Sequence, residues 1–281
     1  MGTLRSIESR HRGVRHGPIT RLISPAELGE RLKPFVFLDY FSGDVQPGFG
    51  FGMHPHSGIA TLTWQPGCDV LYEDTTGKHG VLKAGGLEWM LSGAGAWHQG
   101  QLMARGHAIG FQLWVPMPPG VENGPSLGQY VPPDSVPLLD IPQGRVRLLL
   151  GRMEGHSGQI ASPIHSHQDM NYFVVDLDPN TEWEYSVPAT HEIAWAFVFQ
   201  GAGRLQRVAS QLELMVLGDA GSICVGADET PVRAIVGSGR RHPYPLVLGQ
   251  SSIHTSEADL RRGEAEIERI GRVLREQRRI S

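Results

Sequence analysis

Three histidines in the first half of the chain have the residue type and the spacing to hold a transition metal. One residue separates His54 from His56, and His98 follows 42 residues later. Residues i and i+2 of a strand face the same side, so His54 and His56 are expected to project together. Imidazole nitrogens bind iron, zinc, copper and nickel. The trio therefore predicts a metal site, the alternative being polar residues at the mouth of a cleft.

The sequence around these histidines predicts short strands. Glycine (36) and proline (20) are frequent in the 281 residues, so turns should be many and long helices few. Short apolar runs end at glycine or proline, and they cover residues 59–64, 70–72, 80–83, 87–91 and 110–115. This rhythm is typical of a β-barrel or β-sandwich, so an all-β fold class is expected.

The second half of the chain repeats this style, which predicts a duplicated β-domain. Prolines crowd residues 116–143 and mark a linker or crossover between the halves. We therefore expect one domain over residues 1–130 and a second over 131–281. A helix should close the second domain, because Ser256 and Asp259 form a capping pattern and apolar residues then recur at helical spacing, at Leu260, Ile267, Ile270 and Leu274.

Composition excludes several classes of function. The net charge of −4 leaves no basic footprint, so direct binding of nucleic acid is not expected. No apolar run reaches the length of a membrane span, and the N-terminus lacks a signal-peptide core, so we expect a cytoplasmic protein without membrane attachment. Cys68 and Cys224 lie in apolar runs and are expected to be buried and unpaired.

Two segments of the chain resemble the metal motifs of the pirins, a family of the cupin superfamily. These are Gly52-Met53-His54-Pro55-His56-Ser57-Gly58 and Gly85-Gly86-Leu87-Glu88-Trp89-Met90-Leu91-Ser92-Gly93-Ala94-Gly95-Ala96-Trp97-His98. The resemblance implies two tandem cupin-type barrels (a bicupin) with a metal, usually iron, in the N-terminal one. Nickel, copper, zinc and manganese are the alternatives. Some pirins oxidise flavonols such as quercetin with dioxygen, and some eukaryotic members bind partner proteins as transcriptional co-regulators.

The chain departs from this family at the fourth ligand. Pirins place a glutamate two residues after the third histidine, where this chain has Gly100, and other cupins place one where it has Ala60. A site of three neutral histidines leaves a divalent ion its full charge and one more open position. The loss of a charged ligand also weakens metal retention. The site is therefore expected either to work with three histidines or to be degenerate.

Several further residues are candidates for the pocket or for decoys. Trp97 is expected either to line the pocket beside His98 or to pack into the core, and Gly100 is expected to face the metal. Gln112 is a candidate hydrogen-bond partner for a histidine on a neighbouring strand. Ser57 and Ser92 suggest a hydrolase, but no nucleophile-elbow pattern or acid partner accompanies them. His165 and His167 repeat the spacing of the first pair, yet no third histidine follows suitably, so no second metal is expected.

The leading hypothesis is a metal-dependent dioxygenase that acts on a flavonol or another enolisable phenolic, with His54, His56 and His98 as metal ligands. The alternative is a non-catalytic pirin-like protein with a degenerate metal site, which binds a protein partner. The missing carboxylates favour the alternative.

Overall fold

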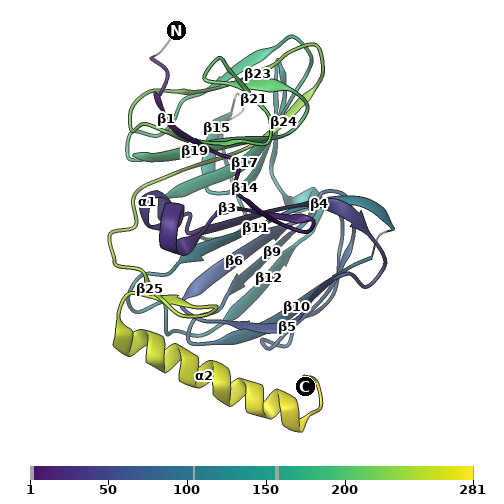
Figure 1. Cartoon of the computed structure of the whole chain (residues 1–281), viewed down its shortest axis with the longest axis vertical. Coiled ribbons are helices and arrows are strands. Elements are labelled where there is room, and N and C mark those ends of the chain that lie inside the picture. The colour runs from purple at the N-terminus through teal and green to yellow at the C-terminus, as the bar shows by residue number, and fades with distance from the viewer. Residues whose placement is uncertain (1–2, 104, 156–157, 281) are drawn as a thin grey trace. The chain divides into compact units, whose positions relative to one another are not determined.

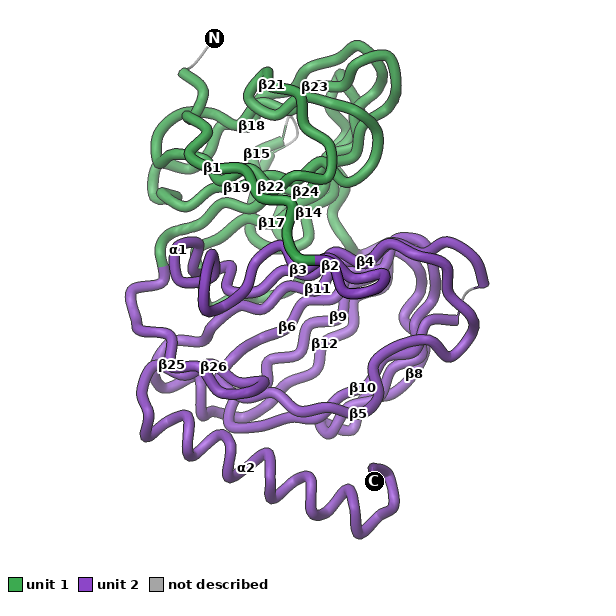
Figure 2. Tube along the Cα trace, viewed as in Figure 1, with its two compact units in different colours: residues 1–14, 136–241 green, residues 15–135, 242–281 purple. Residues whose placement is uncertain are grey.

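The chain forms two compact units, each described here by itself (Figure 2). The computed structural model describes residues 3–103, 105–155 and 158–280. Unit 1 contains residues 1–14 and 136–241, and unit 2 contains residues 15–135 and 242–281. This grouping differs from the expected split at residue 130, because each end of the chain belongs to the barrel made mostly by the other half. The strand at Ile7–His11 pairs with Leu214–Leu217 in unit 1.

Unit 2 consists of two antiparallel sheets (Figure 1). The larger has the order β12-β9-β6-β11-β4-β3-β2. Its strands are β2 (Val14–His16), β3 (Ile19–Ile23), β4 (Phe37–Val45), β6 (Ile59–Trp64), β9 (Leu87–Leu91), β11 (Gly106–Pro116) and β12 (Leu127–Val131). The smaller has the order β5-β10-β7-β8, with β5 (Gly50–His56), β7 (Val70–Asp74), β8 (His79–Leu82) and β10 (Ala96–Leu102). Short helical turns lie at Pro25–Gly29 (η1), Glu30–Leu32 (α1) and Pro133–Ser135 (η2).

Unit 1 repeats this plan with its own two sheets. The larger has the order β1-β22-β19-β24-β17-β14-β13, with β1 (Ile7–His11), β13 (Leu138–Ile141), β14 (Gly144–Leu150), β17 (Met170–Leu177), β19 (Ile193–Gln200), β22 (Leu214–Leu217) and β24 (Val232–Gly239). The smaller has the order β18-β23-β20-β21, with β18 (Glu182–Tyr185), β20 (Gly203–Leu205), β21 (Val208–Ser210) and β23 (Ile223–Ala227). A separate hairpin joins β15 (Arg152–Gly155) to β16 (Gly158–Ala161). The matching sheets confirm the expected duplicated all-β fold.

Each unit has its own apolar core between its sheets. In unit 1, buried side chains such as Phe173, Ala196 and Val236 belong to one large cluster. In unit 2, Cys68 belongs to a cluster with Phe41 and Val70. Alternating strand residues supply these cores, as the sequence pattern predicted. Cys68 and Cys224 are buried free thiols, as expected.

The C-terminal segment of unit 2 contains a short hairpin, β25 (Val247–Leu248) with β26 (Ile253–His254), and the helix α2 (Glu257–Glu276). The Ser256 hydroxyl accepts a hydrogen bond from the Asp259 backbone N–H at 3.1 Å, which confirms the predicted cap. Leu260 and Leu274 are buried on the predicted apolar face of the helix. Most other positions of α2 are charged, and no helix among the described residues is long and apolar enough to cross a membrane.

Candidate metal centre

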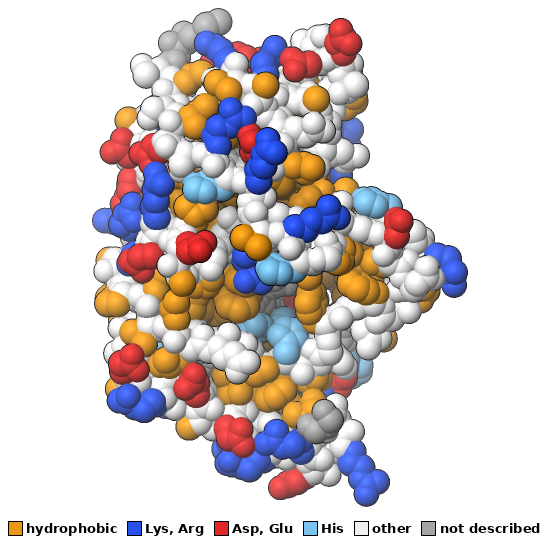
Figure 3. Space-filling model, viewed as in Figure 1, with side chains coloured by type: hydrophobic (Ala, Val, Ile, Leu, Met, Phe, Trp, Pro, Cys, Tyr) orange, Lys and Arg blue, Asp and Glu red, His pale blue; other side chains and the backbone are white. Residues whose placement is uncertain are grey.

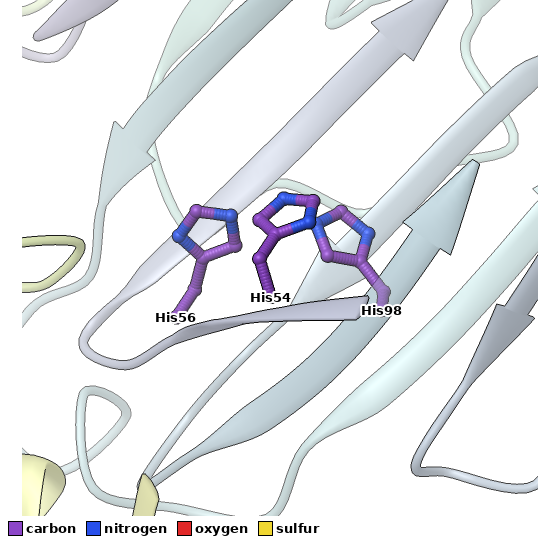
Figure 4. A group of neighbouring side chains, drawn as sticks. All are labelled: His54, His56 and His98. Atoms are coloured by element: carbon purple, nitrogen blue, oxygen red, sulfur yellow. The ribbon is translucent and has the colours of Figure 1, made fainter. Parts of the chain in front are cut away.

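The three predicted histidines come together on adjacent strands of unit 2. His54 and His56 lie on β5, and His98 lies on β10 directly opposite His54 in the antiparallel register. The ring centroids are 4.5 Å apart for His54 and His98, 5.0 Å for His54 and His56, and 5.2 Å for His56 and His98 (Figure 4). One nitrogen from each ring lies within 4.8 Å of the other two. Among the described residues, no other group of three histidine, cysteine or acidic side chains is arranged in this way.

Each of these histidines uses its Nδ1 atom to bind a fixed acceptor. His54 Nδ1 donates to the Gly52 carbonyl at 2.7 Å, and His56 Nδ1 donates to the Ser251 carbonyl at 2.9 Å. His98 Nδ1 lies 2.7 Å from the Glu88 carboxylate. A protonated Nδ1 leaves the Nε2 lone pair free, which is the tautomer that a metal ligand needs. The buried His98 Nε2 has no hydrogen-bond partner among the described residues.

Glu88 is a buried carboxylate beside the histidine cluster that the sequence did not single out. It lies on β9, opposite Thr63 on one side and Tyr130 on the other, and only 4% of its surface is exposed. Buried charges are rare unless they are paired, and its partner here is His98. The sequence signal that could have identified this residue is a glutamate inside an otherwise apolar strand. A carboxylate behind a ligand histidine orients its ring and raises its basicity.

Burial keeps two of the histidines neutral. It lowers the pKa of His54 from 6.5 to about 4, with a further contribution from His98. Burial also lowers the pKa of His56 well below its usual value, again assisted by the neighbouring imidazoles. A neutral ring keeps its lone pair available at physiological pH. His54 and His56 therefore offer nitrogen ligands with little competition from protons at physiological pH.

The two family carboxylate positions leave room but supply no ligand. Gly100 lies on β10 beside a bulge that shifts the register with β5 after His98. A Cβ atom at Gly100 would meet the Val70 side chain at 3.4 Å, an ordinary contact. Ala60 is fully buried on β6. Neither family position therefore supplies a charged ligand, and Glu88 contacts the cluster through His98.

Two of the expected pocket residues have other contacts. Trp97 is next to His98 in the strand, so its side chain points to the opposite face. There its Nε1 donates to the Ile267 carbonyl of α2 at 3.1 Å and anchors the helix. Gln112 Oε1 accepts a hydrogen bond from the Thr63 hydroxyl at 2.8 Å, in place of the expected contact with a histidine. Gln112 thus has a different partner from the expected histidine, whereas the contact of Trp97 with α2 agrees with the packing role that was left open for it.

Aromatic side chains form the surroundings of the histidines instead. The Trp114 ring meets His56 edge-on at 5.0 Å and stacks on Phe37 at 4.0 Å. The Phe51 ring lies 6.1 Å from His54 and is exposed. The face drawn in Figure 3 has a hollow with histidine side chains inside it and hydrophobic side chains around it. This environment suits a flat aromatic molecule.

A buried polar chain connects the C-terminal segment to the strand end next to His56. Ser57 Oγ lies 2.9 Å from His254 Nε2, and His254 Nδ1 lies 3.3 Å from the Glu122 carboxylate. This arrangement supplies the acid partner that the sequence did not reveal. The three residues are at most 1% exposed, however, so no substrate can reach the hydroxyl. The chain of contacts therefore holds structure together and does not form a hydrolase site.

Glycine allows the C-terminal segment to approach this closely. Gly58 has a φ of +72°, and a Cβ atom there would collide with the Ile253 carbonyl. The Ile253 N–H in turn donates to the Ser57 carbonyl at 3.3 Å. This contact places the Ser251 carbonyl where it accepts from His56.

Two matching barrels, one of which carries three inward histidines, define the chain as a bicupin. The pirin family model matches residues 18–115. A pirin-like protein of Caulobacter vibrioides is 31% identical over 240 residues, which cover 83% of this chain and 84% of that protein. The chain therefore belongs to the pirin family.

Other relatives carry names that concern activity and metal. A provisionally named quercetin 2,3-dioxygenase of Pseudomonas aeruginosa is 29% identical over 228 residues, 75% of this chain and 78% of that protein. The structure of quercetin 2,3-dioxygenase from Acinetobacter baumannii matches with a TM-score of 0.85 and 21% identity, over 95% of this chain and 98% of that one. A bacterial pirin from Escherichia coli in complex with nickel(II) matches with a TM-score of 0.62 and 19% identity, over 86% and 100%.

Proposed function

We propose that the chain is a metal-dependent dioxygenase for flavonols or other enolisable phenols, with His54, His56 and His98 as the metal ligands. The observation that carries this proposal is the anchoring of all three Nδ1 atoms, which leaves three Nε2 lone pairs to converge. The names of the relatives support the same activity. Iron is the proposed metal, and nickel is the first alternative because a related pirin binds it.

The protein residues around this site would bind and orient an aromatic substrate. Trp114 and Phe51 flank the histidines and offer ring faces and edges for stacking. A divalent metal at the three histidines would supply charge stabilisation to the deprotonated oxygen of the substrate. Glu88 would hold His98 in position through the 2.7 Å contact.

None of the described residues around the three histidines is placed to act as a general base. Glu88 is engaged with His98, and the pKa of His54, at about 4, is too low for efficient proton abstraction near neutral pH. The substrate should therefore arrive ionised. We expect kcat/KM to rise with pH along the ionisation of the substrate hydroxyl. A series of phenols with different pKa values would show profiles that move with the substrate, and a profile fixed for all substrates would contradict this view.

The test is elemental analysis of untagged protein beside His98→Ala, followed by oxygen uptake with quercetin. We expect near-stoichiometric metal in the wild type and its loss in the variant, with turnover lost in parallel. A second variant, His54→Ala, should behave in the same way. Turnover that survives either substitution at wild-type rates would reject the proposed ligands.

A partner-binding protein without catalysis is the second candidate. The observation in its favour is that Gly100 and Ala60 occupy both family carboxylate positions, so a bound ion has no charged ligand from them. This candidate predicts no metal after reconstitution and no oxygen uptake on any phenol. It also predicts that partner capture is insensitive to chelator.

A further inference from the structure

Unit 1 contains a cleft at its own barrel that the proposed chemistry does not use. Its volume is about 1010 Å³, at the upper end of the range for small-molecule sites. Hydrophobic side chains line one part of it, among them the buried Met153 and the partly buried Ile141 and Trp183. The Trp183 ring lies 6.0 Å from the ring of Phe173, which belongs to the core of this unit. The cleft therefore has a firm apolar wall with an aromatic side chain in it.

Two histidines at this cleft have no hydrogen-bond partner within the described chain. His165 and His167 are exposed cleft-lining residues whose ring centroids are 5.6 Å apart. Burial and the adjacent His165 lower the pKa of His167, which favours the neutral ring. A neutral imidazole donates one hydrogen bond and accepts another. The pair thus offers both functions to a molecule in the cleft.

A connected chain of polar side chains stiffens the opposite part of the cleft. Asn171 Nδ2 donates to the Tyr185 hydroxyl at 2.7 Å, which lies 3.3 Å from Ser238 Oγ. Ser238 Oγ lies 2.9 Å from His191 Nδ1, and His191 Nε2 lies 3.1 Å from the Asp169 carboxylate. Fully satisfied networks of this kind rigidify their surroundings. The cleft is therefore preformed, which lowers the cost of ordering on binding.

The charges around the cleft restrict the ligand. Exposed carboxylates line it at Asp140, Glu154 and Asp169, whereas Arg152 is the one arginine or lysine among its described lining residues. An anionic ligand would be repelled by this rim. The free groups that face a ligand are imidazoles, which pair with neutral hydroxyls, and an indole, which packs on a flat ring.

We propose that the cleft of unit 1 is a second binding site, which takes a neutral hydroxylated aromatic molecule. His165 and His167 bind the hydroxyl groups, and Trp183 packs against the ring. No metal takes part, because no third ligand atom approaches this histidine pair among the described residues. This site is independent of the proposed dioxygenase activity.

The test is calorimetric titration of chelator-treated full-length protein with 4-methylcatechol, beside benzoate and benzylammonium as charged probes. The wild type should bind 4-methylcatechol more tightly than benzoate, which the acidic rim repels, and more tightly than benzylammonium, which has no hydroxyl group for the histidine pair. The double variant His165→Ala/His167→Ala should bind about tenfold more weakly, because two hydrogen bonds are lost. Trp183→Leu should weaken binding as well. The matched control is His79→Ala/His107→Ala, which removes two exposed histidines elsewhere and should bind normally.

Three results would overturn this proposal. Undiminished affinity of the double variant for 4-methylcatechol would show that His165 and His167 do not bind this molecule. Loss of binding in His54→Ala alone would place the probe in the other barrel. Tighter binding of a charged probe, or no binding at concentrations several times about 1 mM, would reject the ligand class. Because the protein is metal-free, failure of the dioxygenase proposal leaves this test unaffected.

Discussion

The pair of Glu88 and His98 allows a sharp test of how the metal centre is supported. Glu88→Gln keeps the size of the side chain and removes its charge. The contact to His98 is 2.7 Å long, and both side chains are about 95% buried. We expect the variant to fold and to bind metal more weakly.

The expected magnitude follows from the change in this hydrogen bond. A bond to an ionised acceptor contributes about 1.5–3 kcal/mol, and a neutral bond contributes about 0.5–1.5 kcal/mol. The difference of about 1.4 kcal/mol corresponds to about tenfold in metal affinity. The loss becomes larger if the amide NH₂ of the new glutamine donates to Nδ1, because Nε2 would then carry the proton and could not bind the ion.

The assay is competition between the protein and a chromophoric chelator for nickel(II) or iron(II). Asp74→Asn is the matched control, because Asp74 is also a buried carboxylate of unit 2. Its carboxylate accepts hydrogen bonds from Tyr130 and from the turn at Thr76. The backbone of Asp74 pairs with that of His98 across β7 and β10, but among the described residues its carboxylate makes no hydrogen bond to the three histidines. The control should lower the thermal midpoint without changing metal affinity.

Two outcomes would refute this reasoning. Wild-type metal affinity in Glu88→Gln would show that the carboxylate does not support His98 as a ligand. An equal loss in Asp74→Asn would show that metal affinity follows general stability of the barrel.

Three further predictions concern the same barrel. Gly100→Glu should tighten metal binding about tenfold, because a side chain fits against Val70 and adds a charged ligand. Unchanged metal affinity in the chelator assay would show that position 100 is not a ligand position. Metal-free protein should lose stability as the pH falls from 6.5 to about 4, by up to about 3 kcal/mol from His54, because the unfolded chain takes up a proton that the folded chain excludes. Denaturant unfolding should show that His54→Gln loses less unfolding free energy than the wild type between about pH 7 and about pH 4.5. An equal loss of unfolding free energy in the two proteins would show that other groups cause it. Gly58→Ala should lower the free energy of unfolding by about 2 kcal/mol or more and weaken metal binding, because a Cβ collides with the Ile253 carbonyl. In limited proteolysis α2 should then be cut faster than in the wild type. An unchanged rate of cleavage would contradict this expectation.

Strand periodicity was sufficient to predict much of the fold. The runs expected at residues 59–64 and 87–91 coincide with β6 and β9. The histidine cluster was also predictable, because i and i+2 share a face and the motif spacing places the third histidine on a paired strand. The cap at Ser256 followed from local hydrogen-bonding rules.

Contacts between distant segments could not be predicted in this way. The exchange of chain ends between the units depends on the pairing of β1 with β22, and each strand pattern alone is compatible with many partners. The Ser251 acceptor for His56 is a backbone carbonyl, which has no sequence signature. Glu88 did have a signal, but which residue a buried carboxylate meets depends on packing across strands.

The hydrogen bond from His56 to Ser251 also affects when the centre can assemble during protein synthesis. It joins residues that are 195 positions apart in the chain. The N-terminal histidines leave the ribosome long before the carbonyl that orients one of them has been made. A nascent chain can begin to form the strands of unit 2, because domains start folding during synthesis. Its three-histidine centre, however, stays incomplete until nearly the whole chain has emerged. Metal loading should therefore be a late, essentially post-translational event, and truncated translation products should not carry a finished site.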